Sequence, residues 1–137
     1  MQASTLVGRT VLIEGDSAQH AQGSQYRAGV KLDASVDNLV VNIFDASGQQ
    51  VQQLNLGAQS PGTTNFVWDG KDSNGNEVPS GNYSVKAIGT ISGDEFSLST
   101  LVNAKVESVT LSGNGQEPLL NLGAAGLVSI NQVSEVM

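Results

Sequence analysis

The sequence lacks cysteine and is poor in charged and aromatic residues. Of its 137 residues, 14% are charged and 4% are aromatic. The absence of cysteine excludes disulfides and thiolate metal sites. It is compatible with a cytosolic protein, and equally with a protein that passes unfolded through an export channel and folds outside. Because an average globular protein is roughly 25% charged, the polar surface here must come mainly from Ser, Thr, Asn, Gln and Gly.

Basic residues are scarce, since 6 Lys and Arg stand against 13 Asp and Glu, for a net charge of −7. They form no basic stripe, so phosphate backbones and anionic lipid surfaces would be repelled. We therefore expect neither nucleic acid as a partner nor membrane insertion. No apolar run approaches the roughly 18 residues of a membrane span. Met1–Leu6 lacks the regions of a signal peptide and resembles the cut end of a longer chain.

Alternation of apolar and polar residues with a period of two predicts β-strands along most of the chain. Asn38–Phe44 is apolar and β-branched, as a buried strand should be, and Gly48 ends the turn that follows it. Tyr83–Gly89 and Phe96–Leu101 also alternate. No interior segment has a helical apolar stripe. We expect an all-β fold with a sandwich, because turn signals separate the strands at short intervals.

The distribution of the strands predicts two domains. Two predicted strands near the start and three near the end are too few to form separate stable sheets. We therefore expect both ends, residues 1–32 plus 103–137, to form one small barrel, with residues 33–102 inserted as a sandwich. The predicted end strands are Val7–Glu14, Tyr26–Leu32, Val106–Leu111, Leu119–Leu122 and Leu127–Ile130, with a polar loop at Gly15–Ser24. Leu54–Ala58 recurs as Leu120–Ala124, which predicts two strands that end in similar turns.

The segment between Trp68 and Tyr83 is dense in oxygen-bearing side chains and raises the question of calcium. A calcium loop needs oxygen ligands at positions one, three and five, Gly at six and Glu at twelve. With Gly75 at six, Asp72 and Asn74 fit positions three and five, but Gly70 falls at one and Gly81 at twelve. We therefore expect an Asn-Gly hairpin and neither metal ligands nor cofactor-binding residues.

Nothing in the sequence predicts catalysis, and we expect no catalytic residues. His20 is the sole histidine and falls in the predicted polar loop, which favours a solvated side chain. No Gly-x-Ser-x-Gly nucleophile elbow is present. Asp94 and Glu95 follow the predicted Ser92-Gly93 turn and are expected to be solvated. The glycine-rich Gly113–Gly115 and Gly123–Gly126 are expected to be turns, since a phosphate loop needs a basic residue and a following helix.

Most of the aromatic residues are predicted to pack in the core. Phe66, Trp68 and Tyr83 lie in strands that flank a turn, which favours burial over an exposed platform for sugars or nucleic acid. Solvent exposure of Trp68 and Tyr83 would instead favour an Ig-like adhesion or carbohydrate-binding module. A hydrolase would require a cleft in which His20 meets a serine and a carboxylate.

Four stretches resemble the C-terminal region of the bacterial flagellar hook cap family, also called hook-assembly scaffolding proteins. They are Gln2–Val11, Ile43–Val51, Phe66–Gly70 with Pro79–Tyr83, and Leu120–Gly123 with the strand that follows. The block from Trp68 to Tyr83 is also similar to Ig-like modules of other secreted bacterial proteins, so the chain ends make the resemblance specific.

The resemblance implies a Tudor-like small β-barrel interrupted by a fibronectin type III/Ig-like β-sandwich. It implies a non-enzymatic scaffold that caps the growing hook and promotes polymerisation of hook subunits. The implied partners are the hook protein and other copies in the cap. The implied location is the distal end of the growing hook, reached by export without a cleaved signal peptide. An adhesion or carbohydrate-binding module remains the alternative.

Overall fold

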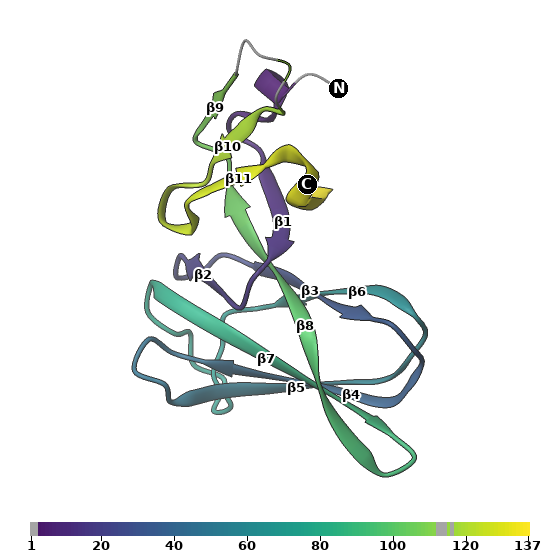
Figure 1. The fold of residues 1–137 in the computed structure, drawn as a ribbon. Helices are drawn as coiled ribbons and strands as arrows, with labels where there is room; N and C mark the ends of the chain where they lie inside the picture. The colour runs from purple at the N-terminus through teal and green to yellow at the C-terminus, as the bar shows by residue number, and fades with distance from the viewer. Residues whose placement is uncertain (1–2, 112–114, 116) are drawn as a thin grey trace. The chain divides into compact units, whose positions relative to one another are not determined.

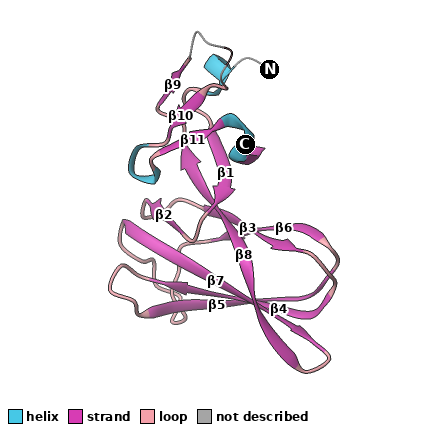
Figure 2. Ribbon diagram, viewed as in Figure 1, coloured by secondary structure: helices cyan, strands magenta, loops and turns pink. Residues whose placement is uncertain are grey.

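The chain is built almost entirely of β-strands (Figure 2). The computed structural model describes residues 3–111, 115 and 117–137. The all-β class expected from the sequence is confirmed. Within the described residues no helix has the length and apolar character needed to cross a membrane. The elements are η1 (Ala3–Leu6), β1 (Thr10–Glu14), β2 (Ser17–His20), β3 (Tyr26–Leu32), β4 (Val36–Phe44), β5 (Gln50–Gln59), β6 (Gly62–Trp68), β7 (Gly81–Ile91), β8 (Asp94–Lys105), β9 (Ser108–Thr110), β10 (Leu119–Asn121), η2 (Gly123–Ala125), β11 (Leu127–Ser129), η3 (Ile130–Gln132) and β12 (Val133–Val136).

The chain divides into two compact units. Unit 1 comprises Met1–Glu14 and Asn103–Met137, and unit 2 comprises Gly15–Val102. The boundary that we expected after residue 32 is therefore wrong. β3 pairs along its whole length with β6, from Tyr26↔Trp68 to Leu32↔Gly62, and it also pairs with β8. Without β3, β6 would have no strand partner, so β3 belongs to the sandwich and not to the small barrel.

Unit 2 contains two sets of antiparallel strands that β8 joins (Figure 1). β5, β4 and β7 are neighbours in that order, while β3 lies between β6 and β8. The first residues of β8 pair with β7, as in Ala87↔Leu98, and later ones pair with β3, as in Ala28↔Val102. The edge of β7 that β8 leaves free at Gly81–Ser84 is occupied by β2.

The core of unit 2 follows from strict alternation along its strands. On β4, Leu39, Val41 and Ile43 are buried, and the residues between them are half-buried. Trp68 is 1% exposed, Tyr83 4% and Phe66 7%. The predicted core position of these three aromatic residues is therefore confirmed.

Unit 1 joins segments from the two parts of the chain that flank unit 2. β1 pairs antiparallel with β12, a strand that we did not expect, with Val11 opposite Val136. β9, β10 and β11 form a three-stranded antiparallel sheet and match the last three predicted strands. The buried apolar side chains come from both segments: Leu6, Val11, Leu12, Ile13, Ala104, Val106, Leu120 and Leu122.

The repeated Leu-Asn-Leu-Gly-Ala segment has one local conformation in two contexts. Asn55 Oδ1 accepts a hydrogen bond from Gly57 N, and Asn121 Oδ1 accepts one from Gly123 N, both at 3.0 Å. Both glycines have positive φ, 70° and 67°. At Gly123 the turn ends β10, as expected. At Gly57 it forms a bulge within β5, where the register against β4 shifts, so β5 continues beyond it.

Candidate functional site

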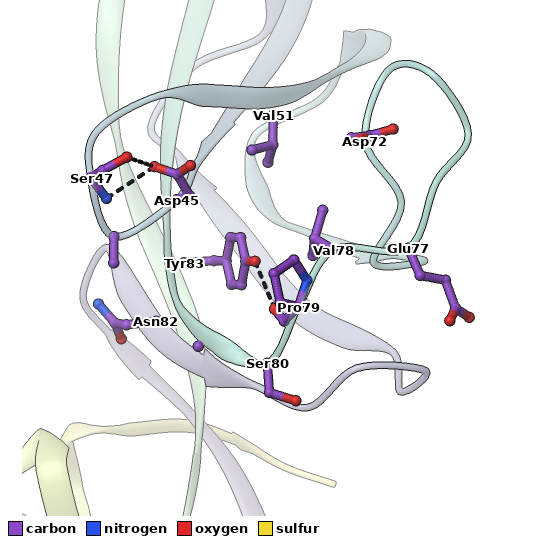
Figure 3. A pocket seen from close by; sticks show the side chains of 12 residues that line it. Asp45, Ser47, Val51, Asp72, Glu77, Val78, Pro79, Ser80, Asn82 and Tyr83 are labelled. Carbon is purple, nitrogen blue, oxygen red and sulfur yellow. Dashed lines mark hydrogen bonds between the residues drawn. The ribbon is translucent and has the colours of Figure 1, made fainter.

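Unit 2 contains an open pocket of about 390 Å³ (Figure 3). It lies among the turn that follows β4, the segment between β6 and β7, and the first residues of β7. Carboxylates stand around its rim, and apolar side chains form its floor. Its lining residues are Asp45, Ala46, Ser47, Val51, Asp72, Glu77, Val78, Pro79, Ser80, Gly81, Asn82 and Tyr83.

Asp45 organises the turn on one side of the pocket. Its Oδ1 accepts hydrogen bonds from Ser47 N at 2.9 Å, Ser47 Oγ at 2.7 Å and Gln49 N at 3.0 Å. Gly48, with φ of 89°, closes the turn. The Ser47 hydroxyl, followed by the backbone donors, holds the pKa of Asp45 below its usual value. Asp45 is therefore a carboxylate at neutral pH, committed to shaping its own turn.

Asp72 shapes the opposite side in the same way. Its Oδ1 accepts hydrogen bonds from Asn74 N and Asn76 N at 3.0 Å each, and Gly75 has φ of 84°. The oxygen that a calcium loop would offer to the metal is thus used by the backbone of its own hairpin. Figure 3 shows Asp45 apart from Asp72 and Glu77, on different sides of the pocket. Within the described part of the chain, no three His, Cys, Asp or Glu side chains gather to hold a metal ion.

The floor of the pocket is closed by Tyr83 and Val78, which are both buried. The Tyr83 hydroxyl donates a hydrogen bond to Pro79 O at 2.7 Å (Figure 3). Burial, and to a lesser degree the negative charge of Asp45, raises the pKa of Tyr83. The phenol therefore stays protonated at neutral pH and fixes the start of β7 to the preceding loop. The hydrogen bonds of Asp45, Asp72 and the Tyr83 hydroxyl thus stabilise the loops that form the pocket.

Tyr83 also belongs to a buried aromatic cluster, which it forms with Tyr26 and Trp68. The Trp68 ring centroid lies 5.7 Å from that of Tyr26 and 5.4 Å from that of Tyr83, with both pairs edge-to-face. The Tyr26 hydroxyl donates to Tyr83 O at 2.9 Å, and Trp68 Nε1 donates to Lys71 O at 2.9 Å. These bonds connect β3 with β7, and β6 with the segment that follows it.

His20 is buried against this aromatic cluster, and the predicted solvated loop position is wrong. The side chain is 4% exposed and ends β2, whose burial alternates between exposed Ser17 and Gln19 and buried Ala18 and His20. Burial with a period of two is typical of a strand. It could not be recognised in the sequence, because three of the four residues are polar. The aromatic rings provide the apolar surface that removes the imidazole from water.

The catalytic arrangement that a hydrolase would need is not assembled at His20. Neither imidazole nitrogen has a hydrogen-bond partner, so no serine or carboxylate of the described residues is bonded to it. Ser92 and Gly93 form the expected hairpin turn, with φ of 51° and 86°. Asp94 and Glu95 follow it as exposed residues at the start of β8. Gly123–Gly126 is a turn closed by Gly126 N bonding to Gly123 O, whereas residues 113 and 114 lie outside the described residues.

Comparisons with known proteins agree across sequence and structure. Residues 15–93, more than half of the chain, match the FlgD Ig-like domain family. The basal-body rod modification protein FlgD of Salmonella typhimurium is 31% identical over 144 residues, which include all of this chain; the chain spans 61% of the length of that relative.

Solved structures extend the likeness to both units. FlgD from P. aeruginosa is 39% identical, with a TM-score of 0.81 over 96% of this chain and 98% of that one. FlgD from Xanthomonas campestris, described for its insights into the hook capping essential for flagellar assembly, is 31% identical, with a TM-score of 0.79 over 98% of this chain and 96% of that one. With a family match over most of unit 2 and structural likeness over the whole length, the chain belongs to the FlgD family.

Proposed function

We propose that this chain is part of a non-enzymatic scaffold that caps the growing flagellar hook and promotes polymerisation of hook subunits. The observation that carries the proposal is the likeness to FlgD of P. aeruginosa over 96% of the chain. A likeness restricted to unit 2 would support only an Ig-like module. The proposed partners are the flagellar hook protein and further copies in the cap, at the distal end of the growing hook.

The local chemistry supports a structural role. The Oδ1 atoms of Asp45 and Asp72 accept backbone hydrogen bonds within their own turns, and the Tyr83 hydroxyl is bonded to Pro79 O. A general base or nucleophile must instead be directed toward a reacting group. We therefore assign no catalytic, cofactor-binding or metal-binding residues. We also propose that unit 1 is the Tudor-like barrel and unit 2 the fibronectin type III-like sandwich, with the boundary corrected to residue 15.

The adhesion or carbohydrate-binding alternative depends on aromatic rings that can stack on a ligand. Trp68 and Tyr83, on which that alternative rests, are both buried. A ring that already packs edge-to-face in the core has no free face for a sugar. The assembly role is thus the better supported of the two functions.

The proposal is tested by deleting the gene that encodes this chain and examining motility and hook formation by electron microscopy. We expect a strain without complete hooks, rescued by the wild-type gene. A core variant, Trp68→Ala, should fail to rescue, whereas Phe96→Ala, which removes a half-exposed ring of unit 2, should rescue. Hooks of normal number and length in the deletion strain would refute the proposed function.

A further inference from the structure

His20 occupies an apolar environment that suits the neutral imidazole and provides no hydrogen-bond acceptor for the charged one. Its ring centroid lies 5.3 Å from that of Trp68, 5.6 Å from that of Tyr83 and 6.1 Å from that of Tyr26. Nδ1 and Nε2 are both buried without a hydrogen-bond partner. A buried polar group without a partner keeps the cost of losing its water, so this residue reduces the stability of its own strand.

The aromatic cluster cannot hydrogen-bond the imidazole, because its polar atoms are engaged elsewhere. Trp68 Nε1 donates to Lys71 O, and the Tyr26 hydroxyl donates to Tyr83 O. The backbone approaches the imidazole closely at Gly70, which has φ of 78°. A Cβ there would lie 2.7 Å from His20 Nε2. The absence of a side chain at Gly70 therefore leaves room for the imidazole.

The titratable groups that face the imidazole are the phenols of Tyr26 and Tyr83, both of whose pKa values are raised, so both are neutral. β6 contributes only the uncharged Trp68 ring. Asp69 and Lys71 flank Gly70, and Asp69 Oδ1 is bonded to Lys71 N. Burial alone lowers the pKa of His20. A released imidazole, with a pKa near its ordinary value of about 6.5, binds a proton more readily than the buried one.

β2 is held to unit 2 by few interactions. It has four residues, pairs only with β7, and buries only the side chains of Ala18 and His20. The ladder between β3 and β6 is seven residues long, and the one between β4 and β7 is equally long. Local opening takes place where few apolar groups are buried and few backbone bonds must break. Loss of β2 would therefore leave the two main ladders intact.

We propose that β2 is an acid-released edge strand, which leaves the edge of β7 when the imidazole of His20 is protonated. Protonation places a charge among aromatic rings without a counterion or an acceptor, and the ring reaches water by leaving with its strand. Release exposes the backbone edge of β7 at Gly81–Ser84 and one side of the aromatic cluster. This device belongs to unit 2 and is independent of the proposed assembly role.

The direction with pH follows from the lowered pKa. The free energy that favours the closed position of β2 is greatest above about pH 6.5. It decreases as the pH falls below that value, because only the released strand gains the proton. The ordinary pKa of the released ring, about 6.5, limits the rise of the opening equilibrium between pH 7.5 and pH 5.0 to about 30-fold.

The test is NMR on the whole chain labelled with ¹⁵N, over a titration from pH 8 to pH 4.5. His20 is the single histidine, so its imidazole nitrogens are assigned without ambiguity. We expect the amide protection factors of Ser17–His20 and Gly81–Ser84 to fall together, by up to 30-fold at pH 5.0. The protection factors of β3, β4 and β6 should change little. The imidazole should titrate below pH 6.5.

His20→Phe is the matched control, since it keeps an aromatic ring and removes the titrating group. In this variant the amides of β2 should remain protected from exchange at pH 7.5 and at pH 5.0. If the phenylalanine ring, which is larger than the imidazole, distorts the cluster, His20→Leu serves as the control. The titration of the wild-type chain tests the proposal even if neither variant folds.

Three results would overturn the proposal. In the first, the imidazole titrates at or above pH 6.5 while β2 stays protected, so that the aromatic faces hold the cation in place. In the second, β2 loses protection equally in His20→Phe. In the third, all strands of unit 2 lose protection in one step, which is global unfolding and not release of an edge strand.

Discussion

At the scale of the residue, Trp68 is the largest of the fully buried side chains among the described residues. It combines full burial, two edge-to-face contacts and a hydrogen bond from Nε1 to Lys71 O. Trp68→Ala should lower the free energy of unfolding by about 3–5 kcal/mol, because the cavity is large and Lys71 O loses its donor. Such a loss is comparable to the whole stability of a small domain.

The measurement is a denaturant melt followed by circular dichroism, with Phe96→Ala as the control. Phe96 is 49% exposed, so its removal should cost roughly 1 kcal/mol or less. A Trp68→Ala melt that coincides with that of Phe96→Ala would contradict the position given to Trp68 in the core.

The rings of Trp68 and His20 belong to one cluster, with their centroids 5.3 Å apart. The sequence nevertheless predicts a buried position for Trp68 and a solvated one for His20. Trp68 was predicted to be buried because it lies in a strand that flanks a turn, where core packing is favoured over an exposed aromatic platform. His20 was not, because its neighbours Ser17, Gln19 and Gln22 are polar and the strand is only four residues long. What buries His20 is the aromatic cluster, whose members are 6, 48 and 63 positions away in sequence, and no local pattern reveals it.

At the scale of the element, the bulge in β5 depends on one side-chain acceptor. Asn55→Ala removes the bond from Gly57 N to Oδ1 and should lower the free energy of unfolding by about 0.5–1.5 kcal/mol. Asn55→Asp keeps an oxygen in that position and should change it by less than about 0.5 kcal/mol. Fluorescence of Trp68, the sole tryptophan, follows the melt of unit 2. Equal losses in the two variants would show that the acceptor is not what stabilises the bulge.

The hairpin between Trp68 and Glu77 should not respond to calcium. Asp72 Oδ1 already accepts two backbone bonds, and position one of the loop is Gly70, without a side chain. The melting temperature should therefore be the same with millimolar calcium and with a chelator. A rise with calcium that disappears in Asp72→Ala would contradict this, since a ligand that binds only the folded state must stabilise it.

Most strands could be located from the sequence, but their partners could not. β4 and β9–β11 follow from alternation and turn residues, which are local. The assignment of β3 to unit 2 depends on its pairing with β6. The paired residues are 30 positions apart in sequence at Leu32↔Gly62 and 42 positions apart at Tyr26↔Trp68. Strand counting placed β3 in the barrel because β2 and β12 were not recognised as strands. β12 was missed because its four residues, Val-Ser-Glu-Val, alternate over too short a length.

At the scale of the whole molecule, we expect the chain to be monomeric or only weakly self-associating in dilute solution. The net charge of −7 opposes close approach of copies in dilute solution. Light scattering over a concentration series at low micromolar protein should give a mass near 14.2 kDa. An oligomer whose mass does not change on dilution would contradict this expectation. Addition of hook protein tests whether assembly requires that partner.

The central claim, that the chain acts at the tip of the growing hook, is tested most directly by immunogold electron microscopy. Antibodies raised against the purified chain would be applied to isolated hook-basal bodies that carry short, incomplete hooks. We predict gold particles at the distal end of these hooks and none at that position in the deletion strain complemented with an empty vector. Labelling confined to other parts of the flagellum, or growing hooks with unlabelled tips, would contradict the claim.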